Sequence, residues 1–268
     1  MTVRIALIGA GIMGGDHARI IAGDMPGATL QVVCDASRER ARTVAEATGA
    51  GDVATDPLVA IGRKDVDAVL IASTDETHAP LMLATITAGK PVLCEKPLAP
   101  TSAEGRQVLD AEIAAGHRLV HLGFMRRFDP AYTAMKRTLE AGTLGRAVMM
   151  HNFHRNVSSP GAWFTGSMAI SNSAPHEFDI ARFVLGVDYR AVSVFQPRRS
   201  DDMVAPVCIV LETTDGQIVN VEINNNAAYG YDVRGELIGE KGSVMLNAPA
   251  ATSLNAALST SSAYAPDW

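Results

Sequence analysis

The N-terminal segment constrains the fold more than any other part of the chain. A run of apolar residues, VRIALIG, leads directly into GAGIMG, which places Gly9, Gly11 and Gly14 in the spacing G-x-G-x-x-G. This spacing suits a tight turn from a strand into a helix, with bare backbone where a pyrophosphate approaches. A helix beginning near Ile12 and Met13 would direct its first amides at the phosphates. The segment therefore predicts a dinucleotide site, and its position between strand and helix is the context such a site requires.

The same alternation of strand and helix continues to residue 124. Short β-branched apolar runs alternate with longer segments of helical spacing, and two of these segments end on a glycine suited to a helix C-terminus. This pattern is typical of a parallel, doubly wound sheet covered by helices, which binds ligands at the carboxyl ends of its strands. The expected strands are VRIALIG (3–9), LQVVCD (30–35), DAVLIAS (67–73), PVLCE (91–95) and RLVHLGF (118–124).

Asp35 bears on the choice of dinucleotide. It ends the second expected strand, where a carboxylate can accept hydrogen bonds from both hydroxyls of the adenosine ribose but would repel a 2′-phosphate. This favours NAD over NADP, while Arg38 lies close enough in sequence to leave NADP open. Asp35 could instead cap the following helix, although Ser37 is also available as the cap.

Beyond residue 124 the pattern changes to a helix near 130–141, a long strand at 146–156, the helix that follows Asn172, and then strands joined by turn signals. Hairpins are expected at 214–216 and 240–242. We therefore expect an α+β domain over 125–268, with a largely antiparallel open sheet and helices on one face, after a first domain over 1–124. The last twenty residues, PAATSLNAALSTSSAYAPDW, show no clear period and are expected to form a loop or loose end.

Composition excludes several classes of protein. The chain has 268 residues, 47% of them hydrophobic, which is enough for a substantial core. Its formal charge of −6, without a basic cluster, disfavours a nucleic-acid partner. Three cysteines far apart in apolar runs favour reduced, buried thiols and a cytoplasmic location. No signal peptide or membrane span is expected, and the histidines show no metal-like spacing.

Two residues are candidates for proton chemistry. Lys96 lies in CEKP, at the carboxyl end of an expected strand, and the alternative interpretation is a solvated surface lysine. His176 opens the helix in SNSAPHEFDIARF, where Asn172 and Ser173 are natural N-caps and Pro175 suits a first turn. The apolar residues that follow His176 at helical spacing also fit a buried core histidine. From the residues alone, both interpretations of each side chain stay open.

At this point the chain resembles the Gfo/Idh/MocA oxidoreductases, most closely their inositol 2-dehydrogenase branch. The motifs GAGIMG, ASTDETHAP, CEKPLA, GFMRRFDPAY, SNSAPHEFDIARFVLG and YGYDVRGELIGEKGSV occur in the family's order and cover essentially the whole chain. The resemblance implies a Rossmann domain followed by an α/β domain whose open sheet often mediates oligomer contacts. It also implies an NAD-dependent oxidation of a secondary hydroxyl of a cyclic polyol, with conversion of myo-inositol to 2-keto-inositol as the first expectation.

The resemblance also implies roles for individual residues. Lys96 matches a lysine that contacts the substrate hydroxyl and nicotinamide, and His176 matches the acid/base, for which an imidazole suits neutral pH. The expected catalytic residues are Lys96, His176 and Asn172. The expected cofactor-binding residues are Gly9, Gly11, Ile12, Met13, Gly14, Asp35, Arg38, Ser73, Thr74, His78, Glu95, Lys96, Met125 and Arg126. The expected substrate-binding residues are Lys96, Arg127, His154, Asn156, Asn172, His176 and Tyr231.

Two departures from the family stand out. Inositol-type members usually have aspartate four residues before the histidine, whereas this chain has Asn172, which can hydrogen-bond but cannot stabilise a protonated imidazole by charge. Relatives also continue beyond the final YAPDW, so the resemblance implies a C-terminus that is shortened. The alternatives are a sugar dehydrogenase of the same family and a non-catalytic dinucleotide-binding sensor. We expect a homo-oligomer, dimer or tetramer, and no membrane partner.

Overall fold

The computed structural model describes residues 2–159, 161, 163–197, 204 and 206–246. The chain divides into two compact units, residues 1–123 and 124–268. The predicted C-terminal loop, PAATSLNAALSTSSAYAPDW, lies outside the described residues. Within the described ranges, no helix is both long and apolar enough to cross a bilayer.

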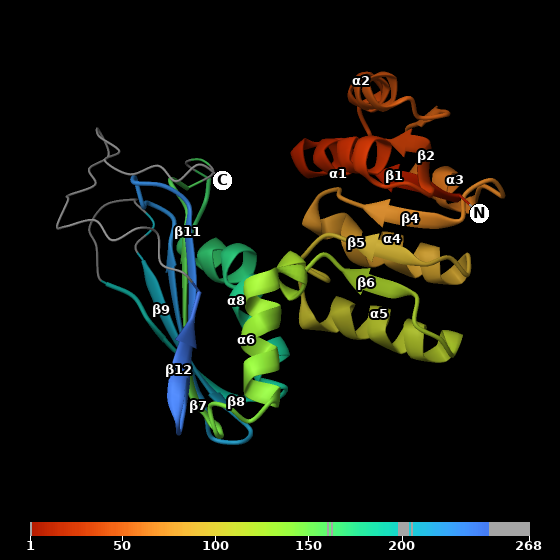
Figure 1. Cartoon of the computed structure of the whole chain (residues 1–268). Helices are drawn as coiled ribbons and strands as arrows, with labels where there is room; N and C mark the ends of the chain where they lie inside the picture. The colour runs from red at the N-terminus through yellow and green to blue at the C-terminus, as the bar shows by residue number, and fades with distance from the viewer. Residues whose placement is uncertain (1, 160, 162, 198–203, 205, 247–268) are drawn as a thin grey trace. The chain divides into compact units, whose positions relative to one another are not determined.

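The first unit is a parallel six-stranded sheet, in the order β3-β2-β1-β4-β5-β6 (Figure 1). This confirms the predicted doubly wound fold. Its strands are β1 (Val3–Ile8), β2 (Ala28–Cys34), β3 (Val53–Ala54), β4 (Ala68–Ile71), β5 (Val92–Cys94) and β6 (Val120–Leu122). Its helices are α1 (Ile12–Asp24), α2 (Arg38–Thr48), α3 (Pro57–Gly62), α4 (Asp75–Thr87) and α5 (Ser102–Ala115).

Alternation along the strands divides the core of this unit into two layers. On one face, Leu7 and Val33 pack with buried residues of α1 and α2. On the other face, Ile8 and Ile71 pack with α3, α4 and α5. Because side chains alternate along a strand, burying both faces requires a nearly continuous apolar run, which is what these strands carry.

The second unit is a mixed six-stranded sheet, in the order β12-β11-β7-β10-β9-β8. The pair β7–β10 is parallel and the remaining pairs are antiparallel, so the sheet is largely antiparallel as predicted. Its strands are β7 (Ala147–Arg155), β8 (Tyr189–Phe195), β9 (Val207–Thr213), β10 (Ile218–Asn224), β11 (Asp232–Gly239) and β12 (Gly242–Met245). Its helical segments are η1 (Met125–Phe128), α6 (Pro130–Glu140), α7 (Gly166–Met168), the π-helix η2 (Ala169–Ser173) and α8 (Pro175–Leu185).

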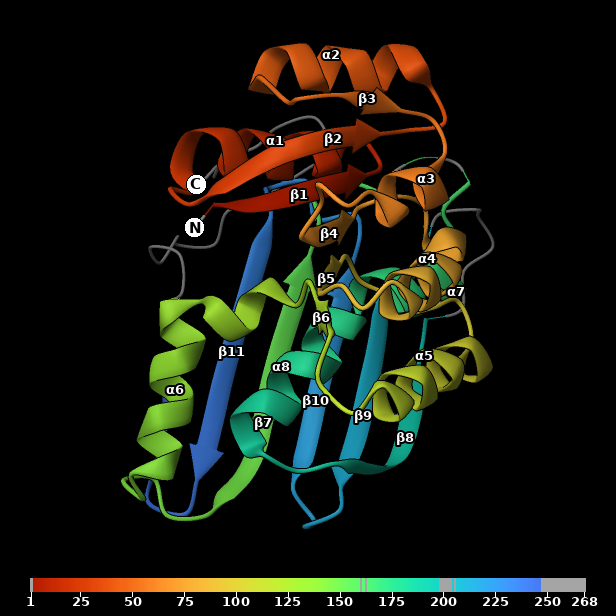
Figure 2. The same cartoon turned by 90° about the vertical axis from the view of Figure 1, so that its right-hand side faces the viewer.

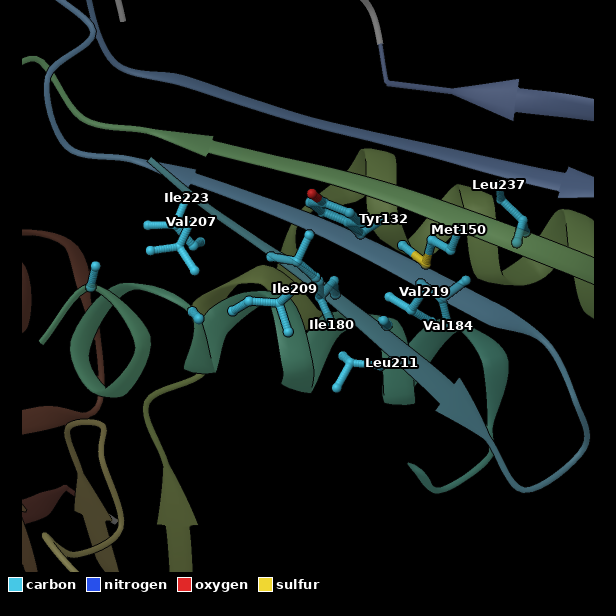
Figure 3. Packing of buried hydrophobic residues seen from close by; sticks show 14 of the residues in the cluster. Tyr132, Met150, Ile180, Val184, Val207, Ile209, Leu211, Val219, Ile223 and Leu237 are labelled. Carbon is cyan, nitrogen blue, oxygen red and sulfur yellow. The ribbon is translucent and has the colours of Figure 1, made fainter. Parts of the chain in front are cut away.

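Helices α6 and α8 cover one face of this second sheet (Figure 2). Figure 3 shows Ile180 and Val184 of α8 packed against Ile209 of β9 and Val219 of β10. Ile180 is fully buried, which anchors α8 along the sheet. This anchoring of α8 matters because the helix carries His176 in its first turn.

Some elements differ from the sequence expectation. The short strand β3 and the helix α3, which Asp56 caps, were not predicted because they are too short to show a period. The predicted N-cap of the His176 helix was wrong. The chain is already helical through the π-turn η2, and Ala174, in right-handed helical conformation, precedes α8 without a side-chain cap.

Candidate active site

The glycine loop of the first unit fits a bound pyrophosphate. Gly9 has φ +97, and a Cβ there would lie 2.6 Å from the backbone of Ala72 and Ser73. A Cβ on Gly14 would lie 1.9 Å from the Gly9 carbonyl oxygen. A Cβ on Gly11, in contrast, would meet no atom within 4 Å, so bare backbone faces open space at the N-terminus of α1. Two glycines are thus required by packing, and the third leaves room for a phosphate group.

Asp35 follows β2, and its carboxylate is held by the backbone. Oδ2 accepts from the Ala10 amide at 2.8 Å, and Oδ1 accepts from the Ser37 amide at 2.8 Å. Ser37, not Asp35, is the N-cap of α2. Arg40, which was not among the predicted residues, donates to Asp35 Oδ1 at 3.2 Å and places a guanidinium beside this carboxylate. The carboxylate is oriented beside the glycine loop, where an adenosine ribose would reach its remaining lone pairs.

Lys96 and Glu95 follow β5, next to α1. His17 Nε2 of α1 lies 2.7 Å from Glu95 Oε1. Burial alone would raise the pKa of Glu95. The hydrogen bond with His17 and the charges of His17 and Lys96 have the larger effect, so the pKa of Glu95 lies below its ordinary value. Burial lowers the pKa of Lys96 despite the charges of Asp75 and Glu95. A half-buried cation with a lowered pKa can donate a hydrogen bond to a developing alkoxide and exchange a proton more readily than a surface lysine.

His78 connects the two strand ends that carry Ser73 and Lys96. Its Nδ1 lies 2.7 Å from the Pro97 carbonyl oxygen, and its Nε2 lies 3.1 Å from the Ser73 carbonyl oxygen. The ring is buried in α4, and Thr74 immediately precedes that helix as its N-cap residue. His78 therefore holds the β4 and β5 loops together, which favours a structural role at the border of the cofactor site.

In the second unit, His176 lies in the first turn of α8, directly after Pro175. The residue is 9% exposed, and its ring lies 6.1 Å from the ring of His154, centroid to centroid. The Phe124 ring packs edge-on against it at 6.2 Å. The apolar stripe of α8 faces the sheet, so the same helix both buries a core face and presents an imidazole at its leading end.

A buried charged cluster supports His154. Arg126 donates a hydrogen bond to Glu177, whose Oε1 also lies 3.1 Å from His154 Nδ1. Tyr231 packs edge-on against His154, with ring centroids 5.9 Å apart, and is itself 39% exposed. The structure thus brings together His154, His176 and Tyr231, which the sequence pointed to as substrate contacts. Arg126 was assigned to the cofactor; that role stays a prediction, and the ion pair gives Arg126 a structural role besides.

Other predicted residues have defined partners. Arg127 forms an ion pair with Asp179 of α8, and its guanidinium lies near the rings of Phe124 and Phe183. Asn156 Nδ2 donates to Asn225 Oδ1 at 2.6 Å. Met125, in contrast, is 52% exposed at the start of η1.

Asn172 lies within the π-turn η2 that precedes α8. Single π-turns occur often at functional sites because they shift the side chains that flank them relative to regular α-helical spacing. Asn172 was predicted from the sequence as a site residue, whereas Glu177 and His17 were not. Glu177 stands beside His176 in the sequence, and a charged residue on the apolar side of a helix was the signal that could have identified it.

Comparison with known families places both units. Residues 3–124 match the model of an oxidoreductase family with an NAD-binding Rossmann fold, and residues 132–245 match the GFO/IDH/MocA C-terminal domain.

Individual relatives are similar along nearly the whole chain. Inositol 2-dehydrogenase 4 of Saccharopolyspora erythraea is 45% identical, over 99% of this chain and 80% of that protein. Inositol 2-dehydrogenase of Klebsiella pneumoniae is 40% identical, over all of this chain and 81% of that protein. Among solved structures, myo-inositol dehydrogenase from Lactobacillus casei, in complex with NAD(H) and myo-inositol, superposes with a TM-score of 0.89 at 28% identity, covering 96% of this chain and 77% of that one.

Proposed function

The chain belongs to the GFO/IDH/MocA oxidoreductase family, and on that premise we propose that it oxidises a secondary hydroxyl of an inositol to a ketone with NAD as the cofactor. The observation that carries the proposal is the combination of a fitting glycine loop with a cluster of imidazole and phenol groups in the second unit. The inositol 2-dehydrogenases, at 40 to 49% identity, support this substrate class.

In the proposed reaction, the cofactor, Lys96 and His176 have separate roles. NAD, when bound, supplies the acceptor for the hydride. Lys96 donates a hydrogen bond to the reacting hydroxyl oxygen and stabilises negative charge that develops there. His176 takes the hydroxyl proton as general base.

The remaining site residues orient the substrate and cofactor. His154, Asn156, Arg127 and Tyr231 offer both donors and acceptors, which a ring with several neutral hydroxyls needs. In the first unit, Asp35 would bind the ribose hydroxyls, and the preference for NAD over NADP follows from its charge.

A homo-oligomer built through the open sheet of the second unit, a cytoplasmic location and a place in polyol metabolism belong to this proposal. An oligomer is supported by the sheet face opposite α6 and α8, which carries half-buried residues such as Met149, Phe153 and Val210. A size measurement in solution tests the oligomer.

One specific observation favours a second function. The family resemblance implies an aspartate at the position of Asn172, which has an amide instead, so a dinucleotide-binding sensor without turnover is the second candidate. The test is to follow NADH absorbance with myo-inositol, scyllo-inositol and glucose. Turnover of an inositol supports the dehydrogenase, and turnover of glucose alone supports a sugar dehydrogenase. Saturable NAD binding without turnover of any of the three supports the sensor.

A further inference from the structure

Arg126 makes a buried contact with His154 that the proposed chemistry does not use. Arg126 lies in η1 and His154 in β7, and each residue is 5% exposed. Arg126 Nη2 lies 3.4 Å from His154 Nδ1, while Arg126 Nη1 donates a hydrogen bond to Glu177 Oε1. The two end nitrogens of one rigid guanidinium thus face two different groups, an imidazole and a carboxylate.

The Arg126 contact determines which ring nitrogen of His154 carries the proton. A guanidinium has no acceptor atom and is not deprotonated in proteins, so Nη2 can only donate. A neutral imidazole has one nitrogen that donates and one that accepts, and Nδ1 must therefore be the acceptor. The proton of His154 then lies on Nε2.

The contact of His154 with Glu177 does not reverse this assignment. Glu177 Oε1 lies 3.1 Å from Nδ1, which is an ion-pair distance, but the contact does not have the geometry of a hydrogen bond. An imidazole nitrogen has a single in-plane position, which holds either a proton or a lone pair. At Nδ1 the hydrogen bond is the one from Arg126, and the carboxylate oxygen already accepts from the other end of the same guanidinium.

The charges around His154 are balanced when its ring is neutral. Burial alone would lower the pKa of Arg126, but the charge of Glu177 has the larger effect and raises it, so Arg126 stays cationic. The other titratable groups next to the cluster are His176, Tyr132 and Tyr231. With one cation paired to one anion, a second proton on His154 would add an unpaired buried charge.

We propose that Arg126 is a positioning residue that holds His154 with its proton on Nε2, so that His154 donates a hydrogen bond to a substrate oxygen. The ring of His154 lies 6.1 Å from the ring of His176, centroid to centroid. Because a protonated Nε2 cannot take the hydroxyl proton, the two neighbouring imidazoles have different roles, and His176 is the base of the pair. This rests on the proposed function only in that the ligand is a polyol.

The direct test is the nitrogen-15 NMR spectrum of His154 in the substrate-free protein, assigned with His154→Gln. At about pH 8, where an ordinary histidine is neutral, we expect an unprotonated Nδ1 and a protonated Nε2. Glu177→Gln keeps the Arg126 donor and should keep this tautomer. Arg126→Met removes the donor and leaves the carboxylate beside Nδ1, so the proton should move to Nδ1.

The matched control is Arg137→Met, on the exposed surface of α6, which should leave the spectrum of His154 unchanged. A wild-type His154 with a proton on Nδ1, a tautomer that changes in Glu177→Gln, or one that is kept in Arg126→Met overturns the proposal. If Arg126→Met does not fold, the spectra of the wild type and of Glu177→Gln still decide.

Kinetics test the different roles of the two histidines. His154→Gln keeps a donor but cannot take a proton, so it should change the KM for myo-inositol and keep the pH dependence of kcat. His176→Gln should lower kcat by about a hundredfold or more. A changed pH dependence in His154→Gln would contradict its role as a donor. If no polyol is turned over, the proposed function fails, while the spectra still decide whether Arg126 sets the tautomer.

Discussion

At the residue scale, the three glycines of the nucleotide loop meet different constraints. Gly14→Ala would place its Cβ 1.9 Å from the Gly9 carbonyl oxygen, whereas Gly11→Ala meets no protein atom within 4 Å. We therefore predict that Gly14→Ala lowers the melting temperature by several degrees, while Gly11→Ala keeps it and weakens NAD binding by about tenfold or more. Calorimetry and an NAD titration measure the two effects. Equal behaviour of the two variants would contradict the assignment of the loop.

Asn172 gives a second prediction at this scale. Asn172→Asp would add a carboxylate four residues before His176, which stabilises the protonated imidazole and favours proton uptake. We predict a rise in kcat of about tenfold, with the acid limb of the pH–rate profile moved to higher pH. Steady-state kinetics across pH measure both. An unchanged profile would mean that this position does not act on His176.

Glu95 makes stability depend on pH in a defined direction. Its pKa in the folded chain lies below the ordinary 4.5, so its contribution to stability is present above that value and lost as pH falls through the folded pKa. Glu95→Gln removes this contribution. Between about pH 6 and about pH 3, the free energy of unfolding should therefore fall more in the wild type than in the variant.

The control for Glu95→Gln is Glu46→Gln, on the exposed surface of α2. The free energy of unfolding of this control, measured by urea titration at each pH, should show the same pH dependence as that of the wild type. Parallel curves for Glu95→Gln and the wild type would show that the His17–Glu95 contact does not stabilise the native state.

At the element scale, local patterns were the reliable guide. Apart from the two-residue β3, the strands of both sheets could be predicted because each carries an apolar run or alternation, and the glycines at 49 and 89 ended helices as expected. The π-turn before α8 could not be predicted, since natural N-cap residues stood where the helix in fact continues. The contacts of Glu177 with Arg126 and His154 were equally hidden, because they join residues up to 51 positions apart.

Helix α8 offers a test of how the site is anchored. Ile180 is 0% exposed against the second sheet, so Ile180→Ala should cost about 3 kcal/mol of unfolding free energy. Ile113→Ala, on α5 and 67% exposed, should cost less than about 0.5 kcal/mol. Urea denaturation compares them. Equal costs would show that Ile180 packs less tightly than its burial indicates.

At the scale of the whole molecule, each of the two units carries a different group of the predicted site residues. The first unit offers the glycine loop, Asp35 and Lys96, and the second offers His176, His154 and Tyr231. The nucleotide loop could be located from the sequence because its residues are adjacent. The cluster of His154, His176 and Tyr231 could be predicted only through the family resemblance, since its members come from β7, α8 and the segment before β11.

The central claim is a hydride transfer from an inositol carbon to NAD. Its most direct measurement is the mass spectrum of the reduced cofactor after incubation of the chain with myo-inositol deuterated at carbon 2. The account predicts one deuterium in each reduced cofactor molecule, with no reduction by Lys96→Ala or His176→Ala. Reduced cofactor without deuterium, or none at all from any inositol despite saturable NAD binding, would contradict it.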